Sequence, residues 1–204
     1  MTGVQTCALP ICARVKNVKP HPRYTLVLAD ITDKKIMQEV FELHQPTHVV
    51  HFAAQSFVDL SFEQSFDFTR DNVLGTHVLL ETVRKYGCIQ KFVHVSTDEV
   101  YGEVDGHVTC DESAPLNPMN PYAASKAAAE LYVKAYTKCY NLPCVITRGN
   151  NVFGPKQYPE KVEFSLLPSL EVKELLPHLP EKLMWQAMEC LHHGIPPYKP
   201  SSVS

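Results

Sequence analysis

A run of β-branched and aromatic residues leads directly into a polar turn in KFVHVSTDEVYG, residues Lys91–Gly102. Apolar residues followed abruptly by Ser-Thr-Asp-Glu are typical of a strand that crosses a core and ends at the protein surface. Similar runs lie on either side of this one along the chain. The expected strands are Thr25–Ile31, Thr47–Ala54, Lys91–Ser96 and Pro143–Arg148.

Helical patterns separate these runs. Residues 33–45 have Ile36, Val40 and Leu43 spaced for one helical face, with Asp33 near the N-cap and Pro46 as the stop. Strands that alternate with helices imply right-handed crossovers and a parallel sheet covered on both faces. The sequence therefore predicts an α/β fold with an open, doubly wound parallel sheet. The later helices are expected over Phe66–Tyr86, with Val73, Leu80 and Val83 in the core and Gly87 as its stop, and from Pro121 onward, with Asn120 as the N-cap.

The composition excludes several classes of protein. Of the 204 residues, 45% are hydrophobic and 20% charged, which disfavours disorder and fibrous repeats. A formal net charge of −3 gives no electrostatic case for nucleic acid or an acidic membrane as a partner, and no apolar stretch approaches the roughly 18–20 residues that span a bilayer. The seven cysteines are scattered and form no Cys-x-x-Cys pair, so we expect reduced thiols and a cytoplasmic location.

The two ends of the chain lack this regular pattern. Residues 1–12 have neither helical nor strand periodicity and are expected to be an artefactual leader without function. Residues 164–204 contain recurrent prolines that break any long helix, and only Glu181–His193 could form a modest amphipathic helix. The domain that carries function is therefore expected over residues 13–163.

A dinucleotide-binding sheet normally opens with a strand, a Gly-rich turn and a helix that holds the pyrophosphate. No such fingerprint is present, because Gly3 stands alone and the next glycine is Gly75. Two interpretations follow from this pattern: an α/β protein that binds no dinucleotide, or one that lacks its first βαβ unit. The polar motifs favour the second interpretation.

Tyr122 and Lys126 have the Tyr-x-x-x-Lys spacing in the first turns of the helix that begins at Pro121. Residues four apart share a helix face, so the lysine ammonium can lie beside the phenol. A nearby cation favours phenolate and is expected to lower the tyrosine pKa toward neutrality. The pair could then remove a hydroxyl proton while hydride leaves the same carbon. Alone, this spacing also fits a packed tyrosine and a surface lysine.

Two further polar groups follow predicted strands, where ligands bind in open α/β sheets. Thr97, Asp98 and Glu99 place two adjacent carboxyls at one strand end, where one could act as an acid and the other as a base. His51–Ser56 lies at the end of another predicted strand, where the small Ala53 and Ala54 would let a flat ligand approach the backbone. A polar capping turn and a strand that simply leaves the sheet are the structural alternatives.

These motifs, in this order and followed by RGNNVFGP (Arg148–Pro155), resemble the extended short-chain dehydrogenase/reductase family. Within it they are similar to the nucleoside-diphosphate-glucose 4,6-dehydratases, lyases of nucleotide-sugar metabolism in which Thr-Asp-Glu precedes Val-Tyr-Gly. The resemblance covers residues 13–163. It implies a Rossmann-like domain without its first βαβ unit and without most of the C-terminal substrate domain.

The resemblance also implies roles for particular residues. Thr97 would hydrogen-bond the hexose, Asp98 would protonate the departing C6 hydroxyl, and Glu99 would take the C5 proton. Tyr122 would be the base for the C4 hydroxyl, with Lys126 holding the nicotinamide ribose of NAD. The remaining NAD contacts would come from Asp30, Ile31, Phe52, Ala53, Ala54, Gln55 and Ser56, and substrate contacts from Ser56, Thr97 and Asn151.

The expected partner is a nucleotide sugar carrying dTDP or UDP, and a homodimer is expected through helices 66–86 and 121–141. No metal site is expected, because His48 and His51 have no cysteine or carboxylate set around them. In related proteins a short hydroxyl residue often precedes the asparagine that here is Asn72, whereas this chain has Asp71. An epimerase or decarboxylase of the same superfamily and a non-catalytic truncated product are the alternative functions.

Overall fold

The computed structural model describes residues 22–103 and 109–151. The leader at residues 1–12, the tail at 164–204 and the helix expected over Glu181–His193 lie outside these residues. The chain divides into two compact units, Met1–Asn150 and Asn151–Ser204. The first unit contains, in order, α2 (Lys34–His44), β1 (His48–His51), α3 (Val58–Glu63), α4 (Ser65–Phe68), η1 (Thr69–Leu74), α5 (Gly75–Tyr86), β2 (Lys91–Thr97), η2 (Asp98–Tyr101), α6 (Pro121–Tyr140) and β3 (Cys144–Gly149).

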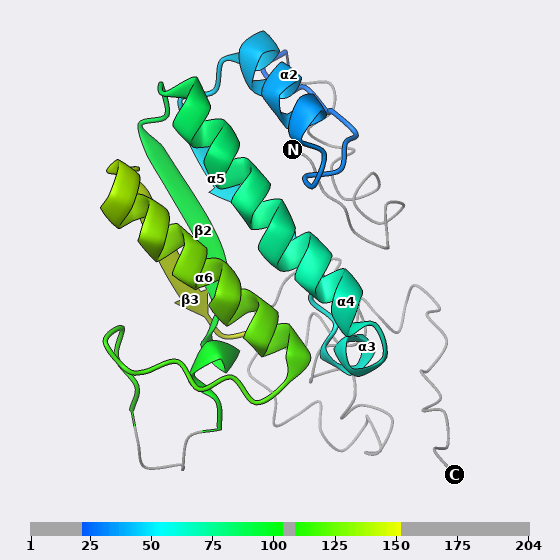
Figure 1. Ribbon diagram of the computed structural model, residues 1–204, viewed down its shortest axis with the longest axis vertical. Helices are drawn as coiled ribbons and strands as arrows, with labels where there is room; N and C mark the ends of the chain where they lie inside the picture. The colour runs from blue at the N-terminus through cyan, green and yellow to red at the C-terminus, as the bar shows by residue number, and fades with distance from the viewer. Residues whose placement is uncertain (1–21, 104–108, 152–204) are drawn as a thin grey trace, which may run out of the picture. The chain divides into compact units, whose positions relative to one another are not determined.

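Three parallel strands form the sheet in the order β1-β2-β3, which confirms the predicted parallel α/β arrangement. Helices α5 and α6 run side by side across it, with α2 next to α5 (Figure 1). His51, His94 and Ile146 are neighbours in register, and the two histidines are buried. The adjacent row of Val50, Val93 and Val145 is more open, since Val50 is 50% exposed and Val145 42% exposed.

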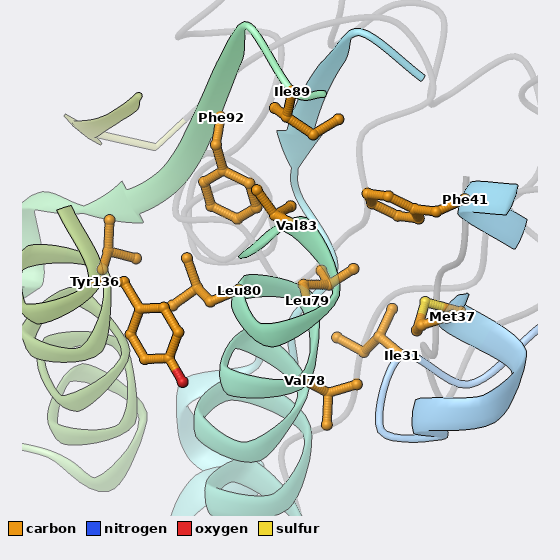
Figure 2. Close-up of a cluster of buried hydrophobic side chains, with 11 residues drawn as sticks. Ile31, Met37, Phe41, Val78, Leu79, Leu80, Val83, Ile89, Phe92 and Tyr136 are labelled. Carbon is orange, nitrogen blue, oxygen red and sulfur yellow. The ribbon is translucent and has the colours of Figure 1, made fainter. Parts of the chain in front are cut away.

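The hydrophobic core lies where α2, α5 and α6 meet the sheet. Leu80 and Phe92 are fully enclosed, and Ile31 and Met37 approach them from the segment around α2 (Figure 2). Gly75 begins α5 close to this cluster, and a Cβ atom there would clash with the end of the Ile31 side chain. A larger residue at position 75 would therefore require the Ile31 side chain or α5 to shift.

The predicted caps agree with the structure. The Asp33 side chain accepts hydrogen bonds from the backbone N–H groups of Lys35 and Ile36 at 2.9 and 3.0 Å. Asn120 accepts from the N–H of Ala123 at 2.7 Å, and Pro121 follows in the first turn of α6. Gly87 ends α5 in the left-handed conformation that glycine favours, with φ of 73°.

Two predictions about the first of these elements were wrong. Thr25–Ile31 is not a strand: residues 24–30 have no regular structure, and Leu28 is 79% exposed. A strand needs a hydrogen-bonded neighbour, and no described strand pairs with this run. Leu43 is 77% exposed, because α2 turns Met37 and Phe41 inward instead.

The long helix expected over Phe66–Tyr86 is interrupted. It consists of α4, the π-helical turn η1 and α5, in which each N–H of the π-turn reaches one residue further back than in an α-helix. Val73 lies in this turn and is only half-buried, whereas Leu80 and Val83 are in the core as predicted. The structure contains no described helix that is both long and apolar enough to cross a membrane.

Candidate active site

Polar residues from three elements gather at the carboxyl edge of the sheet. Gln55 and Ser56 follow β1, Thr97 ends β2, and Tyr122 and Lys126 lie in the first turns of α6. In a parallel sheet the carboxyl ends of the strands face the same edge, so residues far apart in sequence become neighbours. The structure thus brings together most of the residues that the sequence identified.

Tyr122 and Lys126 are both buried, with 9% and 4% of their surfaces exposed. The Tyr122 ring packs edge-on against Phe68, with ring centroids 6.3 Å apart. The Lys126 ammonium donates to the carbonyl oxygen of Val95 at 2.7 Å, which ties α6 to β2. Burial lowers the Lys126 pKa to about 8, and the carboxylate of Glu130 acts in the opposite direction.

The electrostatic setting of Tyr122 differs from the prediction. Its pKa is raised to about 12, first by burial and then by the charge of Glu99, with Asp98 adding to the rise and a hydrogen bond from Thr97 opposing it. One donor of the Lys126 ammonium is bonded to the Val95 carbonyl, and the charges that act on the phenol are those of the two carboxyls Glu99 and Asp98. Tyr122 is therefore a neutral hydrogen-bonding group at neutral pH in this structure.

The two neighbouring carboxyls occupy the 3₁₀ turn η2 and are held by different partners. Thr97 caps the turn: its hydroxyl donates to Asp98 Oδ1 at 3.2 Å and accepts from the Glu99 N–H at 3.3 Å. Glu99 Oε2 accepts from the side-chain amide of Asn120 at 3.0 Å, the residue that caps α6. The cap of α6 therefore fixes Glu99 close to Tyr122, and the turn presents two adjacent carboxyls at the end of β2.

Asn72 joins the end of β1 to α6. Its amide accepts from the Gln55 N–H at 2.7 Å and donates to the Gln55 carbonyl at 3.0 Å and to the Ser125 hydroxyl at 2.8 Å. Ser125 in turn donates to the Tyr122 carbonyl at 2.7 Å. The π-turn is what directs this asparagine inward, as π-turns often do at functional sites.

The neighbouring Asp71 is also buried. Its carboxylate accepts from the side-chain amide of Gln55 and from Arg70, both at 2.8 Å. In the sequence, Asp71 stands out only as a departure from the family pattern, and no part in the site is predicted for Asn72 or Ser125. The signal available in the sequence was three polar residues at positions where helices otherwise turn apolar side chains to the core.

We expect Asn72→Ala to lower the free energy of unfolding by about 3 kcal/mol, because it removes three buried hydrogen bonds, two to the backbone of Gln55 and one to the Ser125 hydroxyl. Urea denaturation followed by circular dichroism measures the change. Thr69→Ala, which removes an exposed hydroxyl from the same π-turn, is the matched control and should stay within about 0.5 kcal/mol of the parent. Equal losses in the two variants would show that the Asn72 contacts add nothing.

The remaining predicted residues lie further from this cluster. Asp30 is exposed and accepts hydrogen bonds from the N–H and hydroxyl of Thr32 at 2.8 and 2.7 Å. Phe52 is 65% exposed, whereas the side chain of Ile31 belongs to the core. Asn151 is exposed and begins the second compact unit. Among the described residues, no group of three or more His, Cys, Asp or Glu side chains is arranged to hold a metal ion.

Comparison with known proteins agrees with this arrangement. The sequence model of the GDP-mannose 4,6 dehydratase family matches residues 4–171. The dTDP-D-glucose 4,6-dehydratase of Mus musculus is 49% identical over 158 residues, which cover 76% of this chain and 44% of that protein. A trifunctional UDP-glucose 4,6-dehydratase/UDP-4-keto-6-deoxy-D-glucose 3,5-epimerase/UDP-4-keto-L-rhamnose-reductase of Arabidopsis thaliana is 46% identical over 159 residues, covering 76% of this chain and 24% of that protein.

Among solved structures, the dTDP-glucose 4,6-dehydratase DesIV from Streptomyces venezuelae, crystallised with NAD bound, aligns with a TM-score of 0.72 and 42% identity. The alignment covers 78% of this chain and 48% of DesIV. The chain thus spans between about a quarter and a half of the length of these relatives. With a family match over most of its residues, the chain belongs to the GDP-mannose 4,6 dehydratase family.

Proposed function

We propose that this chain carries the catalytic segment of an NAD-dependent lyase that converts a nucleoside-diphosphate glucose, dTDP- or UDP-glucose, to its 4-keto-6-deoxy product. The observation that supports this most is the turn Thr97-Asp98-Glu99 held beside Tyr122. A dehydrogenase or an epimerase needs only the tyrosine, whereas the removal of water requires an acid and a base together. The names of the relatives from mouse and Arabidopsis support the same reaction.

Each residue has a distinct task in this proposal. Tyr122 takes the proton of the C4 hydroxyl, and Thr97 hydrogen-bonds the oxygen at that position. Glu99 removes the C5 proton, which the neighbouring ketone acidifies, and Asp98 protonates the departing C6 hydroxyl. Ser56 contacts the phosphate side of the substrate. The tyrosine must lose its proton during turnover, so its burial beside two carboxyls requires a cation to approach when ligands are bound.

The residues present fit NAD at its nicotinamide end. The Lys126 ammonium has three donors and uses one on Val95, which leaves donors for a ribose hydroxyl and for the phenol. The exposed Phe52 offers an apolar surface near the end of β1. A bound NAD would supply a reversible hydride acceptor, so that the net reaction on the sugar would be an elimination.

The chain as it stands is expected to bind NAD weakly and to show little or no turnover. Its sequence has no Gly-rich turn to hold the pyrophosphate, which is the main anchor of a dinucleotide on such a sheet. Isothermal titration should give no saturation at micromolar NAD. Saturation in that range would contradict this expectation and would point to another anchor for the phosphates.

A chimera tests the reaction itself. Residues 22–151 of this chain would replace the aligned segment of the mouse dTDP-D-glucose 4,6-dehydratase, so that every residue with a proposed task comes from this chain. We expect the chimera to convert dTDP-glucose to a 4-keto-6-deoxy sugar, which is detected by its ultraviolet absorbance in alkali. A folded chimera that only epimerises the sugar, or that binds NAD without turnover, would exclude the dehydratase proposal.

The proposal includes a homodimer formed through helices 66–86 and 121–141, and a cytoplasmic location. A groove lies between α4, η1 and α6, where Phe66 is 88% exposed; it is lined by Phe66, Thr69, Arg70, Val73, Leu74, His77 and Tyr132. Four cysteines of the described chain are free thiols, which fits a reducing compartment. Sedimentation of the chimera and of its Phe66→Glu variant would test the dimer, since a buried charge at this position should separate the subunits.

A further inference from the structure

Glu130 is fully buried, and the proposed reaction gives it no task. It lies on the face of α6 that carries Tyr122 and Lys126, at successive intervals of four residues. A carboxylate removed from water is costly unless charged or hydrogen-bonding groups surround it. Its partners therefore indicate why the helix keeps a charge at this position.

Arg148 of β3 provides the main partner. Its guanidinium holds both oxygens of Glu130, with Nη2 2.6 Å from Oε2 and Nε 3.0 Å from Oε1. The Arg148 side chain is only 9% exposed, so solvent screens this pair little. Lys134 lies 4.0 Å from Oε2, but its side chain is 51% exposed. The pair with Arg148 is therefore the one that fixes β3 to α6.

The same guanidinium also holds the turn that carries the two carboxyls. Nη1 of Arg148 donates to the Tyr101 hydroxyl at 2.7 Å, and the guanidinium lies over the Tyr101 ring, 4.8 Å from its centroid. Tyr101 is the last residue of η2, whose first residues are Asp98 and Glu99. The turn is therefore attached to α6 at two points. Asn120 binds Glu99 directly at the start of the helix, and Arg148 links Tyr101 to Glu130 further along it.

Glu130 also acts on Lys126, one turn earlier on the same face of α6. The groups that face Lys126 come from three elements: His51 on β1, His94 on β2, and Tyr122 and Glu130 on α6. Burial and the charge of Lys126 lower the pKa of His51 to about 3 and that of His94 to about 2, so both imidazoles are neutral at pH 7. The negative charge that acts on Lys126 is that of Glu130.

We propose that Glu130 is a positioning residue: through Arg148 and Tyr101 it holds the turn Asp98–Tyr101 against α6, and it supplies the charge that balances Lys126 inside the domain. The link to catalysis rests on the proposed function, since Asp98, Glu99 and Lys126 are the groups it would position. The two structural parts of the proposal stand independently of NAD and of any sugar nucleotide.

The first test follows the titration of Lys126 in the intact chain. Lysine labelled with ¹³C at Cε gives one NMR signal per residue, and the loss of a signal in Lys126→Arg assigns the one of interest. We expect Glu130→Gln to lower the titration midpoint of Lys126 by about one pH unit, which is about a tenfold increase in its acid dissociation constant. Glu130→Asp should restore most of this shift. A midpoint that does not move in Glu130→Gln would overturn the proposal.

Lys134→Gln is the matched control, because it removes a charge that contacts Glu130 from the exposed side of α6. It should leave the Lys126 midpoint unchanged. An equal shift in this control would assign the effect to the general charge of the helix and would also overturn the proposal.

A second test avoids any loss of buried charge and so is available even where Glu130→Gln fails to fold. Tyr101→Phe removes only the hydroxyl that Arg148 holds. We expect the backbone amide signals of Asp98, Glu99 and Val100 to shift or broaden while the Lys126 midpoint stays in place. Unchanged amide signals would show that the turn is held without Arg148. Because neither test uses NAD or substrate, failure here is distinct from failure of the proposed reaction.

Discussion

Acidification from pH 6.5 to pH 5 is expected to lower the free energy of unfolding of this chain by about 3 kcal/mol, through two buried histidines. His51 and His94 are neighbours in register on β1 and β2, with ring centroids 5.3 Å apart. Burial, assisted by the charge of Lys126, lowers their pKa values to about 3 and about 2. In the folded chain neither imidazole takes up a proton at pH 5, whereas both do so once the chain unfolds.

The direction in which stability changes with pH follows from proton uptake on unfolding. Below the ordinary histidine pKa of about 6.5 the unfolded chain binds more protons than the folded chain, so stability falls as the pH falls. Stability is unaffected by these two groups above that pH. The loss continues until the pH reaches their folded-state values, near 3 and 2. Urea denaturation at pH 6.5, 6 and 5 measures it.

His94→Leu separates this explanation from general acid sensitivity. Neither nitrogen of His94 has a hydrogen-bond partner in the described chain, so an apolar side chain costs little there at pH 7. We expect this variant to lose about half as much stability between pH 6.5 and pH 5 as the parent. His48→Gln, at an exposed position of the same strand as His51, should lose as much as the parent. A His94→Leu variant that is as acid-sensitive as the parent would contradict the explanation.

The second large effect concerns catalysis in the chimera defined above. Tyr122→Phe is expected to lower its turnover number about a thousandfold, because it removes the group proposed to take the proton of the C4 hydroxyl. The ring keeps its edge-on contact with Phe68, so the fold should be unaffected. Single-turnover absorbance of the reduced nicotinamide would show that the hydride step itself is lost.

Tyr86→Phe is the control for this substitution. It removes a tyrosine hydroxyl at the far end of α5, where the ring packs edge-on against Phe41 in the core. Turnover in this variant should match that of the parent chimera. A Tyr122→Phe chimera with undiminished turnover would remove Tyr122 from the proposed mechanism and leave the carboxyl turn as its main support.

The sequence predicted the parts of the fold that depend on local signals. Asp33, Asn120 and Gly87 mark helix ends through bonds or conformations within a few residues of themselves, and all three agree with the structure. Thr25–Ile31 failed because a strand depends on a partner elsewhere in the chain, which local composition does not reveal. The π-turn was missed for a related reason: one wide turn hardly changes the spacing of apolar residues.

The candidate site shows the same division between local signals and contacts with distant residues. Tyr122 and Lys126 were recognisable by spacing, and Asp98 and Glu99 by their position after a strand. The surrounding hydrogen bonds join residues that are far apart in sequence. Asn72 lies 17 positions from Gln55 and 53 from Ser125, and Arg148 lies 18 from Glu130. The pKa of Tyr122 depends on burial and on which neighbour the ammonium faces, and spacing alone gave the wrong direction.

The π-helical turn η1 has a consequence for how this chain tolerates changes in length. It accommodates one more residue per turn than the α-helices on either side, so Asn72 faces Gln55 while α5 still turns Leu79 and Leu80 to the core. Deleting a single residue from Thr69–Leu74 would remove the extra residue and let the segment wind as an ordinary α-helix, with α4 and α5 keeping nearly the same rotation relative to each other. Leu79 and Leu80 would then still face the core, whereas the wide turn that directs Asn72 to Gln55 would be lost, so a one-residue deletion here should disturb the candidate site more than the core.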